Sequence, residues 1–193
     1  MAIEVTEEAI TALPDYARVP IAFAVDCVLD VTNRDDRWGG FVLSERRIDV
    51  PYEKDYDAIA GEGPSQWGRR FDLSNWALFT ARVAGCIVGG ATIAFDTPEL
   101  TMLEGRRDLA VLWDIRVSPD LRRQGVGAAL FQRAERWAQR RGCRQIKIET
   151  QNTNVRACRF YERQGCELRA INRAAYPEHS EEIQLLWYKD LQR

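Results

Sequence analysis

A strand, a short glycine-bearing turn and a long helix follow one another between residues 109 and 141. This succession constrains the fold more than any other part of the chain. The run Leu109–Val117 is apolar and predicts a buried strand, and Val126–Arg141 has the periodicity of an amphipathic helix. The turn between them has the pattern Arg-x-x-Gly-x-Gly, carried by Arg122-Arg123-Gln124-Gly125-Val126-Gly127. N–H groups at a helix start lack intrahelical partners and lie at the positive end of the helix dipole, so the turn predicts a phosphate or pyrophosphate site.

The spacing in this turn excludes two common phosphate loops. The chain has no G-x-G-x-x-G run followed about 20 residues later by an acidic residue, which a dinucleotide-binding fold requires. It also has no G-x-x-x-x-G-K-[ST] run. A tight turn with a solvated basic edge is the alternative interpretation of the pattern.

The composition is that of a soluble globular chain, and the length of 193 residues predicts a single domain over 1–193. No apolar run approaches the roughly 20 residues that span a bilayer. The first eight residues are acidic and lack a secretory apolar region, so we expect a cytoplasmic protein without a membrane partner. Five cysteines without a C-x-x-C pair, and one histidine, argue against a disulfide framework and against a bound metal.

Charge is divided unevenly along the chain, although the net charge is only −2. Residues 1–108 contain 11 basic and 19 acidic residues, whereas residues 109–193 contain 16 and 10. This division predicts an anionic ligand for 109–193 and a cationic one for 1–108, unless it is only solvated surface. Nucleic acid is not an expected partner, because the aromatic residues do not interleave with the basic ones.

The remaining patterns predict a mixed α/β fold. In the first half we expect a short helix over Glu7–Leu13 closed by Pro14, and a loop or lid over Pro51–Phe71 that contains one helical turn. We expect strands at Val19–Val31, Phe41–Val50, Trp76–Ala81 and Cys86–Phe95. In the second half strands and helices alternate, with a helix at Asn154–Gln164 and strands at Gln145–Thr150, Cys166–Ile171 and Ile183–Tyr188.

The second helix carries N-x-x-A-x-x-[FL]-Y, from Asn154 to Tyr161. Together with the glycine turn, this motif resembles the GNAT superfamily of N-acetyltransferases. The resemblance implies a mostly antiparallel central sheet with splayed parallel strands, flanked by helices, and acetyl-CoA as cosubstrate. The coenzyme would contact Asn154, main chain at Ile115, Arg116 and Val117, and the turn residues Arg122, Arg123, Gln124, Gly125, Val126, Gly127 and Ala128.

The resemblance also implies direct attack of an amine on the thioester in a ternary complex. Tyr161 matches the tyrosine that protonates the departing thiolate. Glu149 is our first candidate for the base that deprotonates the amine, and Asp114 is the second. For either carboxylate, a solvated charge at a strand end or a salt bridge is the alternative.

Within the superfamily, the chain is most similar to the streptothricin acetyltransferases, which are antibiotic-resistance enzymes. The similarity lies in P-Y-x-K-D-Y at Pro51–Tyr56, in E-T-Q-x-x-N-V-x-A-C at Glu149–Cys158, and in a final aromatic strand. It implies that Tyr52, Asp55 and Tyr56 bind a small cationic amine, with Asp57 and Trp67 as further charge and aromatic surface. A buried Lys54–Asp55 or Tyr–Asp pair that stabilises this segment is the alternative.

These similarities predict an acetyl-CoA-dependent N-acetyltransferase, with 1–108 as the acceptor-side half and 109–193 as the coenzyme-binding half. Two other functions stay open. The run Asn172–Pro177 is similar to the acceptor loop of ribosomal-protein alanine acetyltransferases, so a protein N-terminus is one alternative acceptor. A non-catalytic acyl-CoA sensor is the other alternative, and a homodimer is the expected assembly.

Overall fold

The computed structural model describes residues 2–34 and 40–191. Its helices are α1 (Leu13–Tyr16), α2 (Pro64–Arg70), α3 (Val126–Arg140) and α4 (Val155–Arg163), with short 3-10 turns at Ile10–Ala12, Thr101–Leu103 and Pro119–Leu121. Its strands are β1 (Glu4–Glu8), β2 (Phe23–Asn33), β3 (Phe41–Lys54), β4 (Ala77–Val83), β5 (Cys86–Ala94), β6 (Leu109–Val117), β7 (Gln145–Gln151), β8 (Glu167–Asn172) and β9 (Gln184–Asp190).

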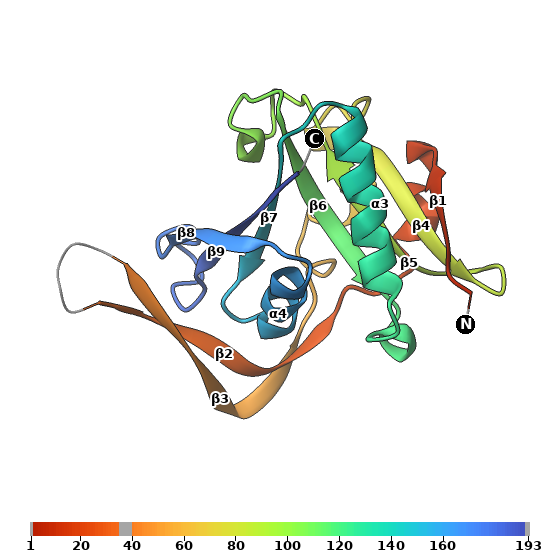
Figure 1. Cartoon of the computed structure of the whole chain (residues 1–193). Helices are drawn as coiled ribbons and strands as arrows, with labels where there is room; N and C mark the ends of the chain where they lie inside the picture. The colour runs from red at the N-terminus through yellow and green to blue at the C-terminus, as the bar shows by residue number, and fades with distance from the viewer. Residues whose placement is uncertain (1, 35–39, 192–193) are drawn as a thin grey trace. The chain divides into compact units, whose positions relative to one another are not determined.

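Within the described residues, one sheet has the order β1-β4-β5-β6-β7-β9-β8, and β2 and β3 pair with each other (Figure 1). The pairs β1–β4, β4–β5 and β5–β6 are antiparallel, whereas β6 and β7 are parallel. This arrangement confirms the predicted mixed α/β fold. No helix in the described ranges is long and apolar enough to cross a membrane.

The described chain clusters into two compact units. Unit 1 contains the residues up to Ala22, Asp55–Ile148, and the residues from Tyr188 onward. Unit 2 contains Phe23–Lys54 and Glu149–Trp187. Strands β7 and β9 therefore contribute residues to both units.

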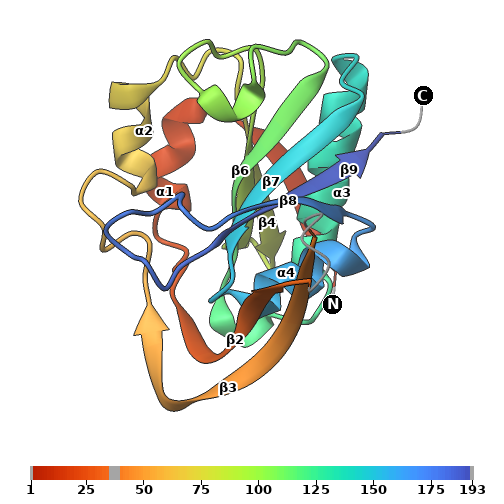
Figure 2. The same cartoon turned by 90° about the vertical axis from the view of Figure 1, so that its left-hand side faces the viewer.

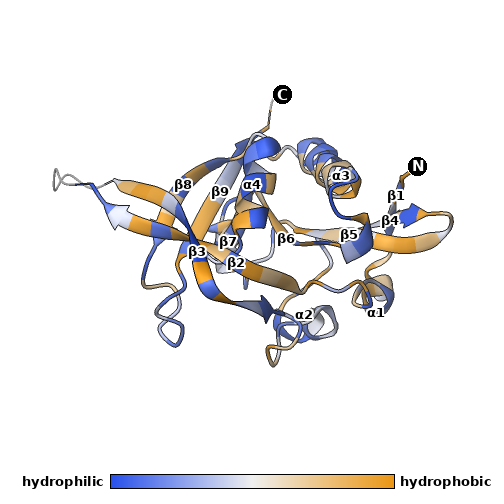
Figure 3. Cartoon of the chain, turned by 90° about the horizontal axis from the view of Figure 1, so that it is seen from below, coloured by the Kyte–Doolittle hydropathy of each residue, from blue (hydrophilic) through white to orange (hydrophobic). Residues whose placement is uncertain are grey.

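In unit 1, helices cover both faces of the sheet formed by β1, β4, β5 and β6. Helix α3 packs on one face, and Figure 2 shows α1 and α2 on the opposite face. One side of α3 is apolar and buried, with Val126, Leu130, Phe131, Ala134, Trp137 and Ala138 recurring at helical spacing. In Figure 3 the central strands are coloured mostly as hydrophobic, whereas α3 carries both colours. The prediction of a core strand followed by an amphipathic helix is thus confirmed.

An aromatic cluster fills the side of unit 1 that carries α2. The indole of Trp67 lies 6.2 Å from that of Trp76 and 6.3 Å from that of Trp113, measured between ring centroids, and Phe71 stacks on Trp76. The Trp67 side chain is buried, and its Nε1–H donates to the Glu62 carbonyl at 2.7 Å. The expectation that Trp67 offers an aromatic face to a cation was wrong, because this indole belongs to the core.

The parallel strands β6 and β7 pair near their beginnings. Leu109, Ala110 and Val111 lie opposite Gln145, Ile146 and Lys147. The splay of the parallel strands that the family resemblance implies concerns the later residues of β6 and stays a prediction.

Unit 2 consists of the β2–β3 ribbon, α4, the end of β7, β8 and the beginning of β9. Asn152 is buried and connects three of these parts. Its carbonyl accepts from the Leu29 N–H at 2.9 Å, and its side-chain oxygen accepts from the Ile183 N–H at 2.8 Å.

The helix predicted over Glu7–Leu13 was partly wrong, although Ile10–Ala12 forms a 3-10 turn. Residues predicted as the helix Glu7–Leu13 begin in β1, which pairs with β4 from Glu4 opposite Arg82 to Glu8 opposite Leu78. Pro14 does not close a helix. It lies in the first turn of α1, where the fixed φ angle of proline is compatible with helical backbone. Local periodicity misses β1 because its partner strand lies more than 70 residues away.

The predicted loop Pro51–Phe71 was partly wrong, since β3 continues to Lys54, but the helical structure expected within it is present as α2. The pairing of β2 with β3 shifts register between Val25, opposite Tyr52, and Cys27, opposite Arg47. Pro51 lies within this bulge, where its missing N–H costs no ladder hydrogen bond. The other predicted elements agree with the structure to within about four residues, a margin typical of sequence-based boundaries.

Candidate active site

The turn before α3 presents unpaired backbone N–H groups. Arg123 and Gly125 have φ angles of 65° and 88°, and Gly125 is the N-cap of α3. Within the described residues, the N–H groups of 123–128 have no hydrogen-bond acceptor, and the first helical bond is donated by Ala129 to the Gly125 carbonyl. These N–H groups at the positive end of a fifteen-residue helix can bind an anion. Gln124, Val126, Gly127 and Ala128 belong to the same turn of chain.

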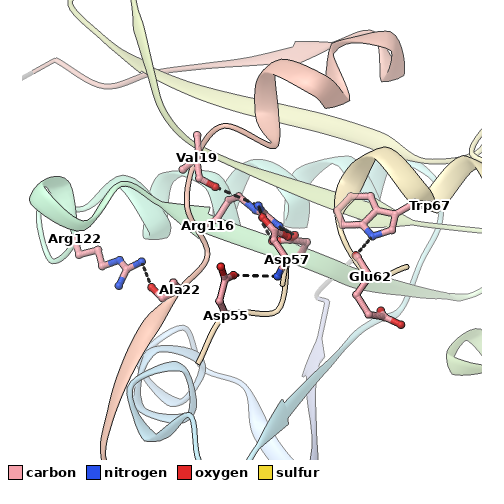
Figure 4. A network of polar contacts seen from close by, with 9 residues as sticks. Val19, Ala22, Asp55, Asp57, Glu62, Trp67, Arg116 and Arg122 are labelled. Carbon is pink, nitrogen blue, oxygen red and sulfur yellow. Dashed lines mark hydrogen bonds and ion pairs between the residues drawn. The ribbon is translucent and has the colours of Figure 1, made fainter. Parts of the chain in front are cut away.

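The two arginines of this turn differ in their surroundings. Arg122 donates from Nε to the Val117 carbonyl at 3.0 Å and from Nη2 to the Ala22 carbonyl at 2.9 Å (Figure 4). It therefore fixes the turn to the end of β6 and to the segment before β2. Arg123 is exposed. Phosphate contacts by either guanidinium stay a prediction.

Arg116, near the end of β6, is at the centre of a buried ion-pair network. Its side chain is 1% exposed and forms bidentate contacts with both Asp57 and Asp114. Nη1 lies 2.6 Å from Oδ2 of Asp57 and also donates to the Val19 carbonyl at 3.1 Å, as Figure 4 shows. The flanking residues Ile115 and Val117 are half-buried. The side chain of Arg116 thus ties β6 to two other segments, while its main chain stays a predicted coenzyme contact.

Asp114 is in the salt bridge that was the alternative to a catalytic role. Its side chain is 5% exposed, and both carboxylate oxygens contact Arg116. Burial raises the pKa of this carboxyl, and the guanidinium of Arg116 opposes the rise. Burial, together with the charge of Asp114, holds the pKa of the Tyr16 hydroxyl well above its usual range. The structure gives Asp114 an ionic partner, and its role as base stays a prediction.

The predicted acceptor residues of unit 1 lie on a short turn after β3. The Asp55 carboxylate is exposed and accepts from the Asp57 N–H at 3.0 Å, and Tyr56 is half-buried. Asp57 directs its own carboxylate to Arg116. The conformation of this turn is therefore fixed by β6.

In unit 2, Glu149 is held by two neutral donors. Tyr176 donates its hydroxyl to Oε1 at 2.5 Å, and Gln184 donates its side-chain N–H to Oε2 at 2.7 Å. Glu149 is half-buried near the end of β7. Tyr176 and Gln184 are 27 and 35 residues away along the chain, so no local spacing in the sequence could have indicated them.

Helix α4 begins at Asn154 and carries the predicted acid. The Asn154 side chain accepts from the Ala157 N–H at 3.1 Å, as an N-cap does. Tyr161 is buried on the same stripe as Cys158 and lies 5.1 Å from the Phe160 ring. The Thr150 hydroxyl accepts from Trp187 Nε1 at 2.9 Å and lies beside the Cys158 sulfur. Asn154 is therefore the N-cap of α4, and the contacts of Asn154 and Tyr161 with a coenzyme stay predictions.

Tyr52 is exposed on β3, beside a mostly buried ion pair between Lys54 and Glu182 in unit 2. Partial burial, and then the charges of Glu182 and Glu181, raise the pKa of Tyr52. The candidate residues thus divide between the two units. Unit 1 contains the turn, the end of β6, Asp114, Asp55 and Tyr56, and unit 2 contains Tyr52, Glu149, Asn154 and Tyr161.

Comparison with known proteins gives agreeing results. Residues 42–166 match the model of the acetyltransferase (GNAT) family. A streptothricin acetyltransferase of Escherichia coli is 32% identical over 171 residues, which cover 86% of this chain and 84% of that protein. The crystal structure of nourseothricin acetyltransferase has a TM-score of 0.77 at 24% identity, over all of both chains. A Bacillus anthracis str. Ames protein in complex with acetyl coenzyme A has a TM-score of 0.76 at 22% identity, covering 100% of this chain and 99% of that one.

Proposed function

Because this chain belongs to the GNAT family of acetyltransferases, we propose that it transfers an acetyl group from acetyl-CoA to a primary amine of a small cationic acceptor such as streptothricin. The 32% identity with a streptothricin acetyltransferase over most of both chains carries this proposal. The exposed Asp55 carboxylate and the exposed Tyr52 ring are suited to a cation.

The turn at 123–128 supports acetyl-CoA as the cosubstrate. Its unpaired N–H groups and the start of α3 fit a diphosphate, since both favour negative charge at this point. When bound, acetyl-CoA supplies the activated acetyl group. The main chain near Ile115 and Val117, at the end of β6, is the segment that we expect to contact an extended pantetheine arm.

In the proposed mechanism, the acceptor amine attacks the thioester directly in a ternary complex. Glu149 accepts a proton from the acceptor ammonium, and Tyr161 donates the proton of its hydroxyl to the coenzyme sulfur. Asp114 is the second candidate base. Its bidentate contact with Arg116 makes it the less available of the two carboxylates.

An acceptor panel tests the proposal. Initial rates of thiol release from acetyl-CoA are measured with streptothricin, an aminoglycoside, a polyamine and a peptide with an N-terminal alanine. We expect the highest kcat/KM with streptothricin, and acetylation of its amine by mass spectrometry. A preference for the peptide would identify an N-terminal acetyltransferase instead. Acetyl-CoA binding without thiol release on any acceptor would favour an acyl-CoA sensor.

A further inference from the structure

The Glu149 carboxylate is oriented by hydrogen bonds and keeps its charge uncompensated. Tyr176 and Gln184 donate one hydrogen bond to each of its oxygens, at 2.5 and 2.7 Å. Among the described residues, no lysine or arginine forms an ion pair with Glu149. Neutral donors fix the plane of a carboxylate while leaving it a proton acceptor, because each oxygen retains a further lone pair.

The hydroxyl of Tyr176 is itself oriented by β7. Gln151 donates from its side-chain nitrogen to this hydroxyl oxygen at 2.8 Å. Gln151 lies two residues after Glu149, on the same face of the strand. With its oxygen accepting from Gln151, the Tyr176 hydroxyl directs its hydrogen to Glu149.

The connection between β8 and β9, residues 173–183, is anchored at its far end. The Asn152 side chain accepts from the Ile183 N–H at 2.8 Å and donates to the Glu181 carbonyl at 3.4 Å. Lys54 and Glu182 form an ion pair with side chains that are 14% and 12% exposed. Gln184 follows directly as the first residue of β9. Both donors to Glu149 therefore belong to a part of unit 2 that is held in place by hydrogen bonds and an ion pair.

We propose that Tyr176 and Gln184 are positioning residues, which hold the Glu149 carboxylate in the orientation that takes the proton from the acceptor amine. The inference rests on the proposed role of Glu149 as the base. A base must lie within hydrogen-bond reach of the proton it abstracts, and small displacements of a catalytic group reduce the rate strongly.

Conservative variants with matched controls test this inference. Tyr176→Phe and Gln184→Leu each remove one donor to Glu149. Tyr188→Phe removes a hydroxyl that donates to Glu104 at 3.1 Å, and Gln145→Leu removes an amide that donates to Asp190 at 2.8 Å. We expect kcat to fall about tenfold to a hundredfold in the first pair, with the KM for acetyl-CoA and the melting temperature near wild type. The controls should keep the wild-type kcat.

A double-variant cycle separates positioning through Glu149 from a general structural effect. In the Glu149→Gln background, Tyr176→Phe should reduce kcat little further, because the group that it orients is no longer a base. Full additivity of the two effects, or a wild-type kcat in both Tyr176→Phe and Gln184→Leu, would overturn the inference while leaving Glu149 as the base. A wild-type kcat in Glu149→Gln would overturn the role of Glu149 as the base, and this inference with it, while leaving the proposed acetyl transfer in place. No transfer by the wild type to any acceptor would overturn the proposed function.

Discussion

Arg116 and Glu149 differ in their hydrogen-bond and ion-pair partners. The Arg116 guanidinium is buried and binds two carboxylates and a carbonyl, so its N–H groups form contacts within the protein. The Glu149 carboxylate is half-buried and meets neutral donors. From the sequence alone, Asp114 and Glu149 were both acidic residues in predicted core strands. Only the three-dimensional partners distinguish a paired carboxylate from one that is oriented but uncompensated.

The Arg116 network predicts a large loss of stability when the cation is removed. Arg116→Met leaves the buried Asp114 carboxylate without its partner, and we expect the free energy of unfolding to fall by about 3–5 kcal/mol. Arg46→Met is the control, because Arg46 pairs with Asp30 with a 58% exposed side chain, and a solvent-exposed pair of this kind contributes little to stability. Urea unfolding measures both. Equal losses in the two variants would show that the network contributes nothing beyond a surface ion pair.

The proposed role of Tyr161 as proton donor leads to a separate prediction about kcat. If its phenol protonates the coenzyme sulfur, Tyr161→Phe should lower kcat by about a hundredfold or more and leave the affinity for acetyl-CoA unchanged. Steady-state kinetics combined with a calorimetric titration of acetyl-CoA would distinguish the two effects. An unchanged kcat would assign proton donation to another group.

At the scale of elements, the two ends of α3 allow a matched comparison. Gly125 at its N-cap and Gly142 just after its C-terminus have φ angles of 88° and 76°, and an added Cβ would meet no close contact at either position. Gly125→Ala and Gly142→Ala should therefore carry a similar strain of about 1–2 kcal/mol. Gly125→Ala should in addition weaken acetyl-CoA binding about tenfold, because the turn relieves its strain by moving its N–H groups.

Thermal unfolding and calorimetric titration of both variants check this expectation. Equal affinities for acetyl-CoA in the two variants would argue that the turn before α3 does not bind the coenzyme.

Elements whose signals are local were predictable from the sequence. Strand β6 was predicted with both ends correct, and helix α4 was predicted to within one residue at each end. Strand β1 and the end of β3 were not, because their structure depends on pairing with distant strands and on the bulge at Pro51. The candidate site follows the same rule. Its motif residues could be listed, but the donors to Glu149 and the ion pair of Asp57 could not.

At the scale of the whole molecule, β7 and β9 connect the two units through continuous strands. We therefore expect the chain to unfold as the single domain that its length predicts, in one cooperative transition. Differential scanning calorimetry is the measurement, and the calorimetric enthalpy should equal the van't Hoff enthalpy. Two resolved transitions would show instead that the units unfold independently.

The central claim is that the turn at 123–128 binds the diphosphate of acetyl-CoA. Its most direct test is a calorimetric comparison of acetyl-CoA with acetyl-pantetheine, which carries the same thioester but lacks the diphosphate and the adenosine 3′-phosphate attached to it. We predict that acetyl-CoA binds at least about a hundredfold more tightly, because several charge-assisted hydrogen bonds are lost with the shorter ligand. Equal affinities for the two ligands, or no binding of acetyl-CoA, would contradict the claim.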